Sequence, residues 1–356
     1  MSKNQKKLQL TGITPNNVNT NIHPNNIQAP QNEDVSKKEE TNPHIQIHQI
    51  STSGNSPEQN SPSENKNIII NSENKINMEV EQEVQEIPIL SFGKEYFKET
   101  WKNLLLGEKK FYPKINCNYM SSQNDINQTM RAILIDWIIE VHSKYCLKEK
   151  TLFHSIFIID TYLSQNTIDR HHLQLLGLAA LLIACKQSEI YFPNLQDFSD
   201  LSDHAYTKKE INEMEIKVMQ HLNFDILAST VEEFYGLLAE FCEFTEKQRY
   251  FGEYFLNASL NDYSLLKYRP SLSAVACTYM VIKYFNLDGA YSLLDLPFLG
   301  VTQEELKACV DDLINCMKNL SNSFLMATKN KYLSEKYLKV AEICLGNGWI
   351  ALITNN

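Results

Sequence analysis

The sequence has little of what marks several large classes of protein. It carries four arginines, its net charge at pH 7 is −10 and its isoelectric point is about 5.5. Proteins that bind a nucleic-acid backbone need a basic face, so this charge argues against that class. No apolar run is long enough to span a bilayer, and no signal-peptide core stands at the N-terminus. We therefore expect no nucleic acid and no membrane among the partners, and a location in the nucleus and cytoplasm.

Motifs of catalysis, nucleotide binding and metal binding are also missing. The eight cysteines form no CxxC pair. Cys185 and Cys277 lie in apolar helical runs, which is typical of free cysteines buried in a reducing compartment. HExxH, GxxxxGK[ST] and GxGxxG do not occur, and the one local histidine pair, His171-His172, lies at a helix start. We expect a chain that is not an enzyme, holds no cofactor or metal, and works by binding.

The first 88 residues differ from the rest in composition. No Phe, Trp or Tyr precedes Phe92, and seven of the eleven prolines fall in this segment. Such a segment buries too little apolar surface to offset its chain entropy, which predicts a disordered tail over residues 1–88. Thr14-Pro15, Ser56-Pro57 and Ser61-Pro62 could be proline-directed phosphorylation sites, but chance occurrence in this composition is at least as frequent.

The stretch from Leu173 to Lys186, LQLLGLAALLIACK, organises the rest of the chain. It is apolar on every face of a helix except at Gln174 and the closing lysine, so we expect it to be buried on all sides. A similar stretch follows Pro270, where residues 276–283 repeat the pattern of residues 179–186. No β alternation persists after Phe92. These features predict an all-α fold of two tandem helical bundles, over residues 89–227 and 228–350.

Other helical patterns surround these two stretches. An amphipathic helix begins at Phe92 and is expected to end before Gly107, and another is expected from Glu335 to Ile343. Thr207 and Glu210 have the spacing of a capping box, which opens a further helix.

The helix expected over residues 130–141, MRAILIDWIIEV, has two apolar sides. One side can face the core, and the other must be covered by a neighbour or offered as a binding surface. Arg131 needs an acidic partner if it is half-buried, and Asp160 on the next helix is a candidate.

Several motifs resemble those of the cyclin family. They are MRAILIDW within YMSSQNDINQTMRAILIDWIIEVHSKYCL, then IDTYLS, ACKQSEIYFP, MEIKVMQHLNFDI, SLNDYSLLKYRPSLSAVA and KNKYLSEKYLKVA. They occur in the order found in A- and B-type cyclins and cover about Phe92 to Ile343. The resemblance implies two five-helix cyclin boxes after an N-terminal helix. It also implies a regulatory subunit that binds and activates a cyclin-dependent Ser/Thr kinase in cell-cycle control, as a heterodimer.

The resemblance also implies roles for particular residues. Lys186 and Glu215 match the pair that engages the kinase in this family, although Lys186 alone could be read as a lysine complementing a helix dipole. Apolar contacts to the kinase are implied at Ile183, Met219, Phe224 and Ile226.

A second surface is implied on the MRAIL helix. In the family this surface docks substrates and inhibitors that carry an Arg-x-Leu motif, while Arg131 and Asp160 match an internal salt bridge. The alternative is that the whole stripe is core, which suits Met130 and Ile133 better than Trp137. The matching docking positions are Met130, Ile133, Leu134, Trp137, Glu140 and Gln174.

The sequence departs from the family at several points. Gln187 and Ser188 stand where an aromatic residue and a glutamate are usual, which bears on the choice of kinase, and Thr161 replaces an arginine. No arginine precedes Arg131 and no KEN tripeptide occurs, so the ordinary Arg-x-x-Leu destruction motif cannot lie in the tail. Two alternatives stay open: a cyclin-fold adaptor that binds partners without activating a kinase, and a transcription-type cyclin-fold protein, which the acidic charge disfavours.

Overall fold

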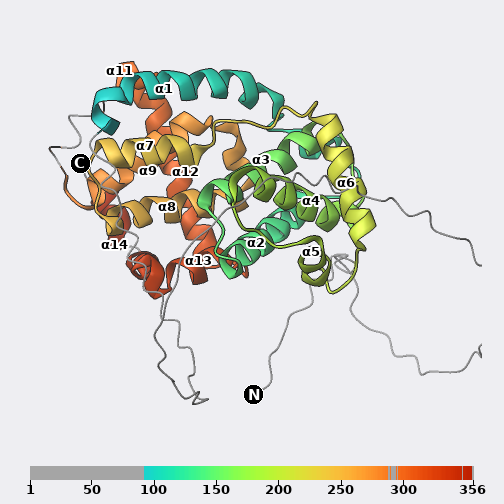
Figure 1. Cartoon of the computed structure of the whole chain (residues 1–356). Coiled ribbons are helices and arrows are strands. Elements are labelled where there is room, and N and C mark those ends of the chain that lie inside the picture. Colours follow the sequence, from blue (N-terminus) through green and yellow to red (C-terminus); the bar gives the residue numbers. More distant parts are fainter. Residues whose placement is uncertain (1–91, 288, 290–293, 295, 347, 355–356) are drawn as a thin grey trace, which may run out of the picture. The chain divides into compact units, whose positions relative to one another are not determined.

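The structure, a computed structural model, describes residues 92–287, 289, 294, 296–346 and 348–354. Every regular element in these ranges is helical, and no strand occurs among them, which confirms the predicted all-α class (Figure 1). The tail predicted to be disordered, residues 1–88, lies outside the described residues. No helix in the described ranges combines the length and the apolar character that crossing a membrane requires.

The first bundle is built around α4, which spans Arg170–Ser188. Every residue of α4 from Leu173 to Cys185 is buried, and the helix packs against α2, α3 and α6. A Cβ atom on Gly177 would lie 2.7 Å from Leu134 Cδ1, so the missing side chain lets α2 approach closely. The other helices of this part are α1 (Phe92–Phe111), α2 (Gln128–Lys144), α3 (Glu149–Gln165), α5 (Leu195–Leu201) and α6 (Lys208–His221).

The second bundle repeats this plan around α9, which spans Pro270–Tyr284 and packs against α7, α8 and α12. Cys277 of α9 is fully buried like Cys185 of α4, and burial raises the pKa of Cys185 to about 12. Both thiols therefore stay protonated, as expected for structural cysteines. The other helices are α7 (Val231–Phe241), α8 (Glu246–Asn261), α11 (Leu296–Leu299), α12 (Gln303–Ser321), α13 (Ala327–Tyr332) and α14 (Gly348–Thr354).

Short 3-10 helices join these elements in the described part of the chain. They are η1 (Tyr112–Lys114), η2 (Tyr119–Ser122), η3 (Tyr263–Lys267), η4 (Glu335–Tyr337) and η5 (Val340–Leu345).

Two helix boundaries differ from the prediction. Helix α1 continues through Gly107 to Phe111, because the glycine allows close approach rather than ending the helix: a Cβ there would lie 2.1 Å from Ser229 Oγ. The helix predicted from Glu335 to Ile343 is replaced by η4 and η5. Leu338 and Lys339, both with φ of 51°, adopt the left-handed conformation between them, which an α-helix cannot include.

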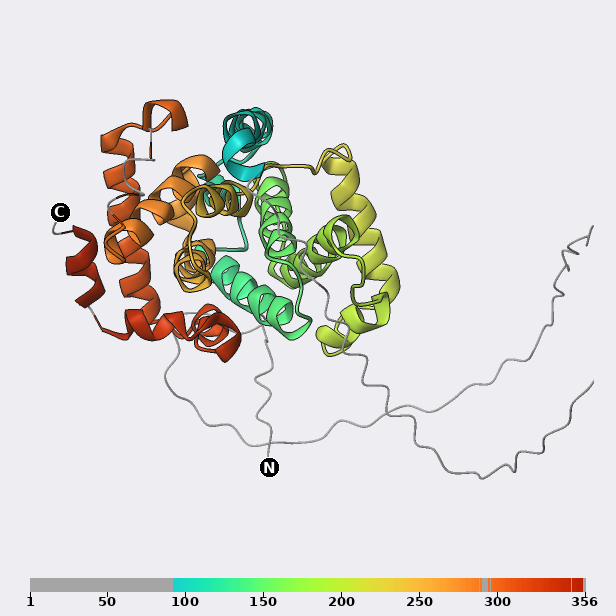
Figure 2. The ribbon, with the colours of Figure 1, turned by 60° about the vertical axis from the view of Figure 1, so that its left-hand side comes forward.

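Helix α2 lies between the two bundles (Figure 2). It contacts α3 and α4 of the first bundle and α8 and α13 of the second. Ile135 and Ile139 are completely buried. Its second apolar side is therefore covered by a neighbour, so most of that side is not open to a binding partner.

Candidate functional site

The exposed end of α4 carries a charged pair at the surface of the first bundle. Lys186 lies in the last turn of α4, and α6 packs against α4 so that Glu215 faces it. The capping box predicted at Thr207 and Glu210 is confirmed and sets where α6 begins. Lys186 Nζ lies 2.5 Å from Glu215 Oε1, with 47% of the lysine side chain and 12% of the glutamate side chain exposed. Because exposed ion pairs are weak, typically up to about 1 kcal/mol, a partner can replace this one at little cost.

Partly or largely exposed apolar side chains lie on α6 and on the segment that follows it. Phe224, which follows α6 in a left-handed conformation with φ of 57°, is 69% exposed. Met219 and Ile226 are half-buried, whereas Ile183 is 3% exposed and belongs to the core. Ile183 can thus support the surface from behind but offers almost no surface of its own.

Sequence reasoning missed two members of this apolar surface. Ile216 is 49% exposed and Leu227 is 70% exposed. Ile216 lies off the buried stripe of α6 and directly follows Glu215, a position where a solvent-facing helix residue is usually polar. That departure from the amphipathic pattern was the available signal.

The six residues predicted on the MRAIL surface divide into two groups. Met130 and Ile133 are half-exposed, and Glu140 is exposed. Leu134 is completely buried against α4, so its predicted place in a docking surface is wrong. The remaining two, Trp137 and Gln174, are 8% and 9% exposed and present little more than an edge.

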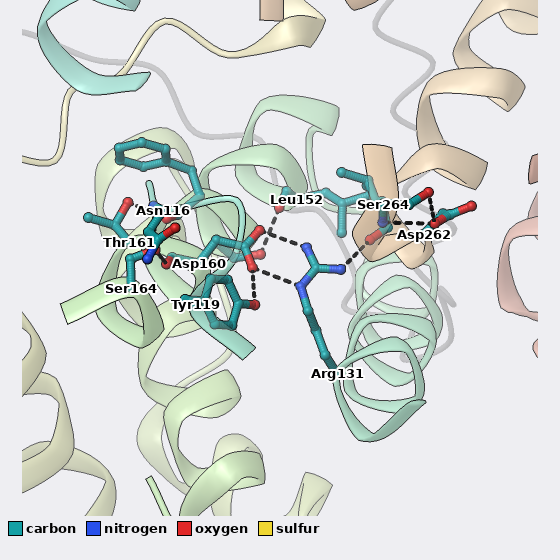
Figure 3. A network of polar contacts seen from close by, with 12 residues as sticks. Asn116, Tyr119, Arg131, Leu152, Asp160, Thr161, Ser164, Asp262 and Ser264 are labelled. Carbon is teal, nitrogen blue, oxygen red and sulfur yellow. Dashed lines mark hydrogen bonds and ion pairs between the residues drawn. The ribbon is translucent and has the colours of Figure 1, made fainter. Parts of the chain in front are cut away.

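Arg131 and Asp160 form a buried, two-pronged ion pair (Figure 3). Arg131 Nε and Nη2 donate to the two carboxylate oxygens of Asp160 at 2.8 and 2.7 Å, and each side chain is 2% exposed. Tyr119 donates to the same carboxylate at 2.8 Å, and Arg131 Nη1 donates to the carbonyl of Leu260 in α8 at 2.9 Å. Burial, and next the charge of Asp160, raises the pKa of Tyr119, which keeps this donor protonated. The network satisfies both charges and joins α2 and α3 to the second bundle.

Comparison with known proteins gives matches over most of the described chain. The family model "Cyclin, N-terminal domain" matches residues 99–227, and "Cyclin, C-terminal domain" matches residues 233–345. The chain is 32% identical over 273 residues to "G2/mitotic-specific cyclin-B" of Hydra vulgaris, which covers 75% of this chain and 74% of the relative.

The chain belongs to the cyclin family. The similarity to cyclin-B relatives identifies it as a B-type mitotic cyclin, a cell-cycle regulator of cyclin-dependent kinases. This confirms the resemblance seen in the sequence. A second relative, "G2/mitotic-specific cyclin-B" of Dictyostelium discoideum, is 34% identical over 66% of this chain and 54% of its own length. Among solved structures, a viral cyclin from herpesvirus saimiri has a TM-score of 0.49 at 20% identity, covering 60% of this chain and 97% of that chain.

In this cyclin the end of α4 is fastened to the start of α3. The Glu189 carboxylate accepts hydrogen bonds from the Lys148 amide at 2.7 Å and from the Thr151 hydroxyl, and Lys148 Nζ donates to the Ser188 carbonyl at 2.8 Å. Glu189 therefore satisfies the backbone amide of the N-cap residue Lys148, as the third residue of a helix does in a capping box. These contacts fix the turn from which Lys186 projects, and sequence reasoning did not foresee them.

A second buried charge pair joins the two boxes of the cyclin. Lys331 Nζ of α13 lies 2.5 Å from Glu149 Oε1 of α3 and 3.0 Å from Asn257 Oδ1 of α8. Burial alone would raise the pKa of Glu149, but the Lys331 ammonium, His142 and the hydrogen bonds from Lys331 and Asn257 together lower that pKa. Helix α13 also contacts α2, where Asp136 Oδ1 accepts a hydrogen bond from the Ala327 amide at 3.0 Å. The boxes are thus held together by polar contacts as well as by apolar packing.

Proposed function

We propose that this cyclin binds and activates a cyclin-dependent Ser/Thr kinase through the surface around Lys186 and Glu215. The observation that supports this best is the combination on one surface of an exposed, exchangeable ion pair with large exposed apolar side chains, above all Phe224 and Leu227. Apolar anchors around charged groups that lose water on binding are the usual composition of an interface hot spot.

Activation follows if the kinase binds this surface only in its active arrangement. An active kinase needs the ion pair between its β3 lysine and its αC glutamate in place. A partner that contacts αC in that position binds the active state more tightly and shifts the population toward it. In this proposal Lys186 and Glu215 exchange their mutual bond for bonds to the kinase, while Phe224, Ile216 and Leu227 bury apolar surface.

The proposal is tested by exchanging the two charges. The double variant Lys186→Glu with Glu215→Lys keeps an internal ion pair, so the fold of the box should be preserved. We expect it to lose kinase capture from native cell extract and to lose histone-directed kinase activity on the beads. Circular dichroism of the variant provides the control for folding, and full kinase activity with the double variant would contradict the proposal.

We further propose that substrates and inhibitors with an Arg-x-Leu motif dock at the exposed part of the MRAIL surface. The half-exposed Met130 and Ile133 can take the leucine, and the exposed Glu140 carboxylate can pair with the arginine. Ile133→Ser should lower kinase activity on a motif-bearing substrate and leave activity on a short peptide unchanged. Equal losses on the two substrates would show that Ile133 acts only through the fold.

One observation favours the adaptor alternative or an unusual choice of kinase. Gln187 Oε1 and Ser188 Oγ are buried and have no hydrogen-bond partner among the described residues. They stand beside Lys186 in place of the aromatic residue and glutamate that the family usually has. A captured kinase without activity in the bead assay would support the adaptor, and mass spectrometry of the captured protein would identify the partner.

A further inference from the structure

A cavity of about 130 Å³ is lined by residues of both cyclin boxes. Phe153, Ile156 and Phe157 of α3 line it from the first box. Val231 of α7 and Leu266 of η3 line it from the second box. The walls are mainly apolar, and they belong to both boxes.

The charged groups at the edge of this cavity already have partners. Arg131 and Asp160, which line the cavity, are bound to each other through two hydrogen bonds (Figure 3). Asp262 accepts hydrogen bonds from the amide and the hydroxyl of Ser264 at 2.9 and 2.7 Å. A charged ligand would therefore have to displace an existing bond, which disfavours it.

The hydroxyl groups of the two tyrosines that line the cavity also have hydrogen-bond partners within the chain. The Tyr112 hydroxyl donates to a backbone carbonyl of η3 at 2.6 Å, and the Tyr268 hydroxyl donates to Asp312 at 2.7 Å. With these donors engaged, a bound molecule gains mainly by packing against the apolar walls.

We propose that this cavity, called here the seam cavity, is a binding site for a small uncharged aromatic molecule of the size of benzene or indole. Apolar protein cavities of about 150 Å³ bind benzene, and the seam cavity, which is partly open to solvent, has a similar volume. The rings of Phe153 and Phe157 can receive an aromatic ligand edge-to-face or offset, the two arrangements that aromatic pairs prefer. The proposal does not depend on how the cyclin binds a kinase.

A molecule in the seam cavity would contact both boxes at once. Because it binds the folded chain and has no site in the unfolded one, it stabilises the folded state, and the gain rises with the logarithm of its concentration once that exceeds the dissociation constant. The contact between the boxes, which Arg131 and Lys331 already secure, would gain apolar packing where the cavity now leaves a gap.

The test uses the full-length chain with benzene and indole as probes. Thermal unfolding is followed while the probe concentration is raised, and methyl NMR signals of Ile156 and Val231 are recorded in the same titration. We expect the melting temperature to rise and the signals to shift along one saturating curve. Signals that do not shift, or shifts that grow linearly without saturation, would overturn the proposal.

A variant that partly fills the cavity tests whether the probe binds there. Val231→Leu places an extra methylene against the ligand, and we expect it to weaken indole binding by about tenfold, which is about 1.4 kcal/mol. The matched control is Val141→Leu, the same change at a buried residue of α2 that does not line the cavity. Equal affinity of the two variants for indole would place the probe elsewhere. If Val231→Leu does not fold, Leu266→Ala enlarges the cavity, and unchanged indole affinity there would equally reject the site.

Discussion

Two ion pairs in the first box have the same chemistry and opposite surroundings. Arg131 and Asp160 are each 2% exposed and are joined by two hydrogen bonds, with Tyr119 donating a third to the carboxylate. Lys186 and Glu215 are joined by one bond, with the lysine 47% exposed. The difference lies in the number of bonds that each charge keeps within the chain. A charge whose bonds are all internal supports the fold, and a charge with open positions is available to a partner.

The two pairs also differ in their basic residue, and each basic residue suits its surroundings. Arginine presents a planar fork that matches a carboxylate in two places, which suits a fixed buried pair. Lysine carries a compact charge on a flexible stem, which can leave one carboxylate for another acceptor. Arg131 also reaches the Leu260 carbonyl of α8, so the buried pair joins the boxes while the exposed pair stays within the first one.

The largest expected effect comes from breaking the buried pair. Asp160→Ala leaves Arg131 charged and without its carboxylate in the interior, which should lower the free energy of unfolding by about 3–5 kcal/mol. Urea unfolding of the full-length chain, followed by circular dichroism, measures the loss.

A second variant separates charge from packing at the same place. Arg131→Met with Asp160→Leu replaces the pair by apolar side chains of similar size and should restore much of the loss, because no buried charge is left unpaired. If Asp160→Ala alone costs less than about 1 kcal/mol, the buried pair does not have the structural role assigned to it.

Local sequence patterns predicted the parts of this fold that depend on neighbouring residues. Apolar periodicity located the two central helices, α4 and α9, and the spacing of Thr207 and Glu210 located the start of α6. The need of Arg131 for an acidic partner on the next helix pointed to Asp160, 29 residues along the chain, and the structure brings the two together. In each case the contact lies within one helix or between adjacent helices.

The parts that sequence reasoning missed depend on contacts across the chain. Glu149 and Lys331 are 182 residues apart, and nothing in the periodicity of either helix marks them as partners. Gly107 has the appearance of a helix end, yet it serves a close approach to Ser229 in the linker between the boxes. Leu134 belongs to the MRAIL motif, but it packs against Gly177 of α4 and is completely buried. Packing between helices that are far apart in the sequence determines these roles. The local pattern of a single sequence does not show which helices pack together.

An intermediate effect is expected at a carboxyl group that lies near the Glu149–Lys331 pair and forms no ion pair with any residue that the structure describes. Burial raises the pKa of Glu253 to about 8. Between the ordinary glutamate pKa, near 4.5, and pH 8 the folded state holds a proton that the unfolded state has lost, so the stability contribution of this group falls as the pH rises. Glu253→Gln removes that dependence.

We therefore expect the variant to gain stability over the wild type, on the order of 1 kcal/mol at pH 8, and to show no gain near pH 4.5. Urea unfolding at several pH values measures the difference. Glu149, whose pKa is lowered, provides the contrast, because its contribution is present at neutral pH and disappears only as the pH falls below about 4.5. A gain for Glu253→Gln that does not vary with pH would show that packing, and not titration, is responsible.

The smallest effect on stability is expected at the exposed pair of Lys186 and Glu215. The two single variants should differ in how much stability they lose. Lys186→Ala leaves Glu215 unpaired with 12% of its side chain exposed, whereas Glu215→Ala leaves Lys186 with nearly half of its side chain in water. Both changes should cost less than about 1 kcal/mol, and the lysine variant should cost more, because the unpaired carboxylate is the less hydrated of the two groups. Urea unfolding of the two single variants measures this order. A cost at this pair as large as that of Asp160→Ala would remove the distinction between a pair that supports the fold and a pair that is open to a partner.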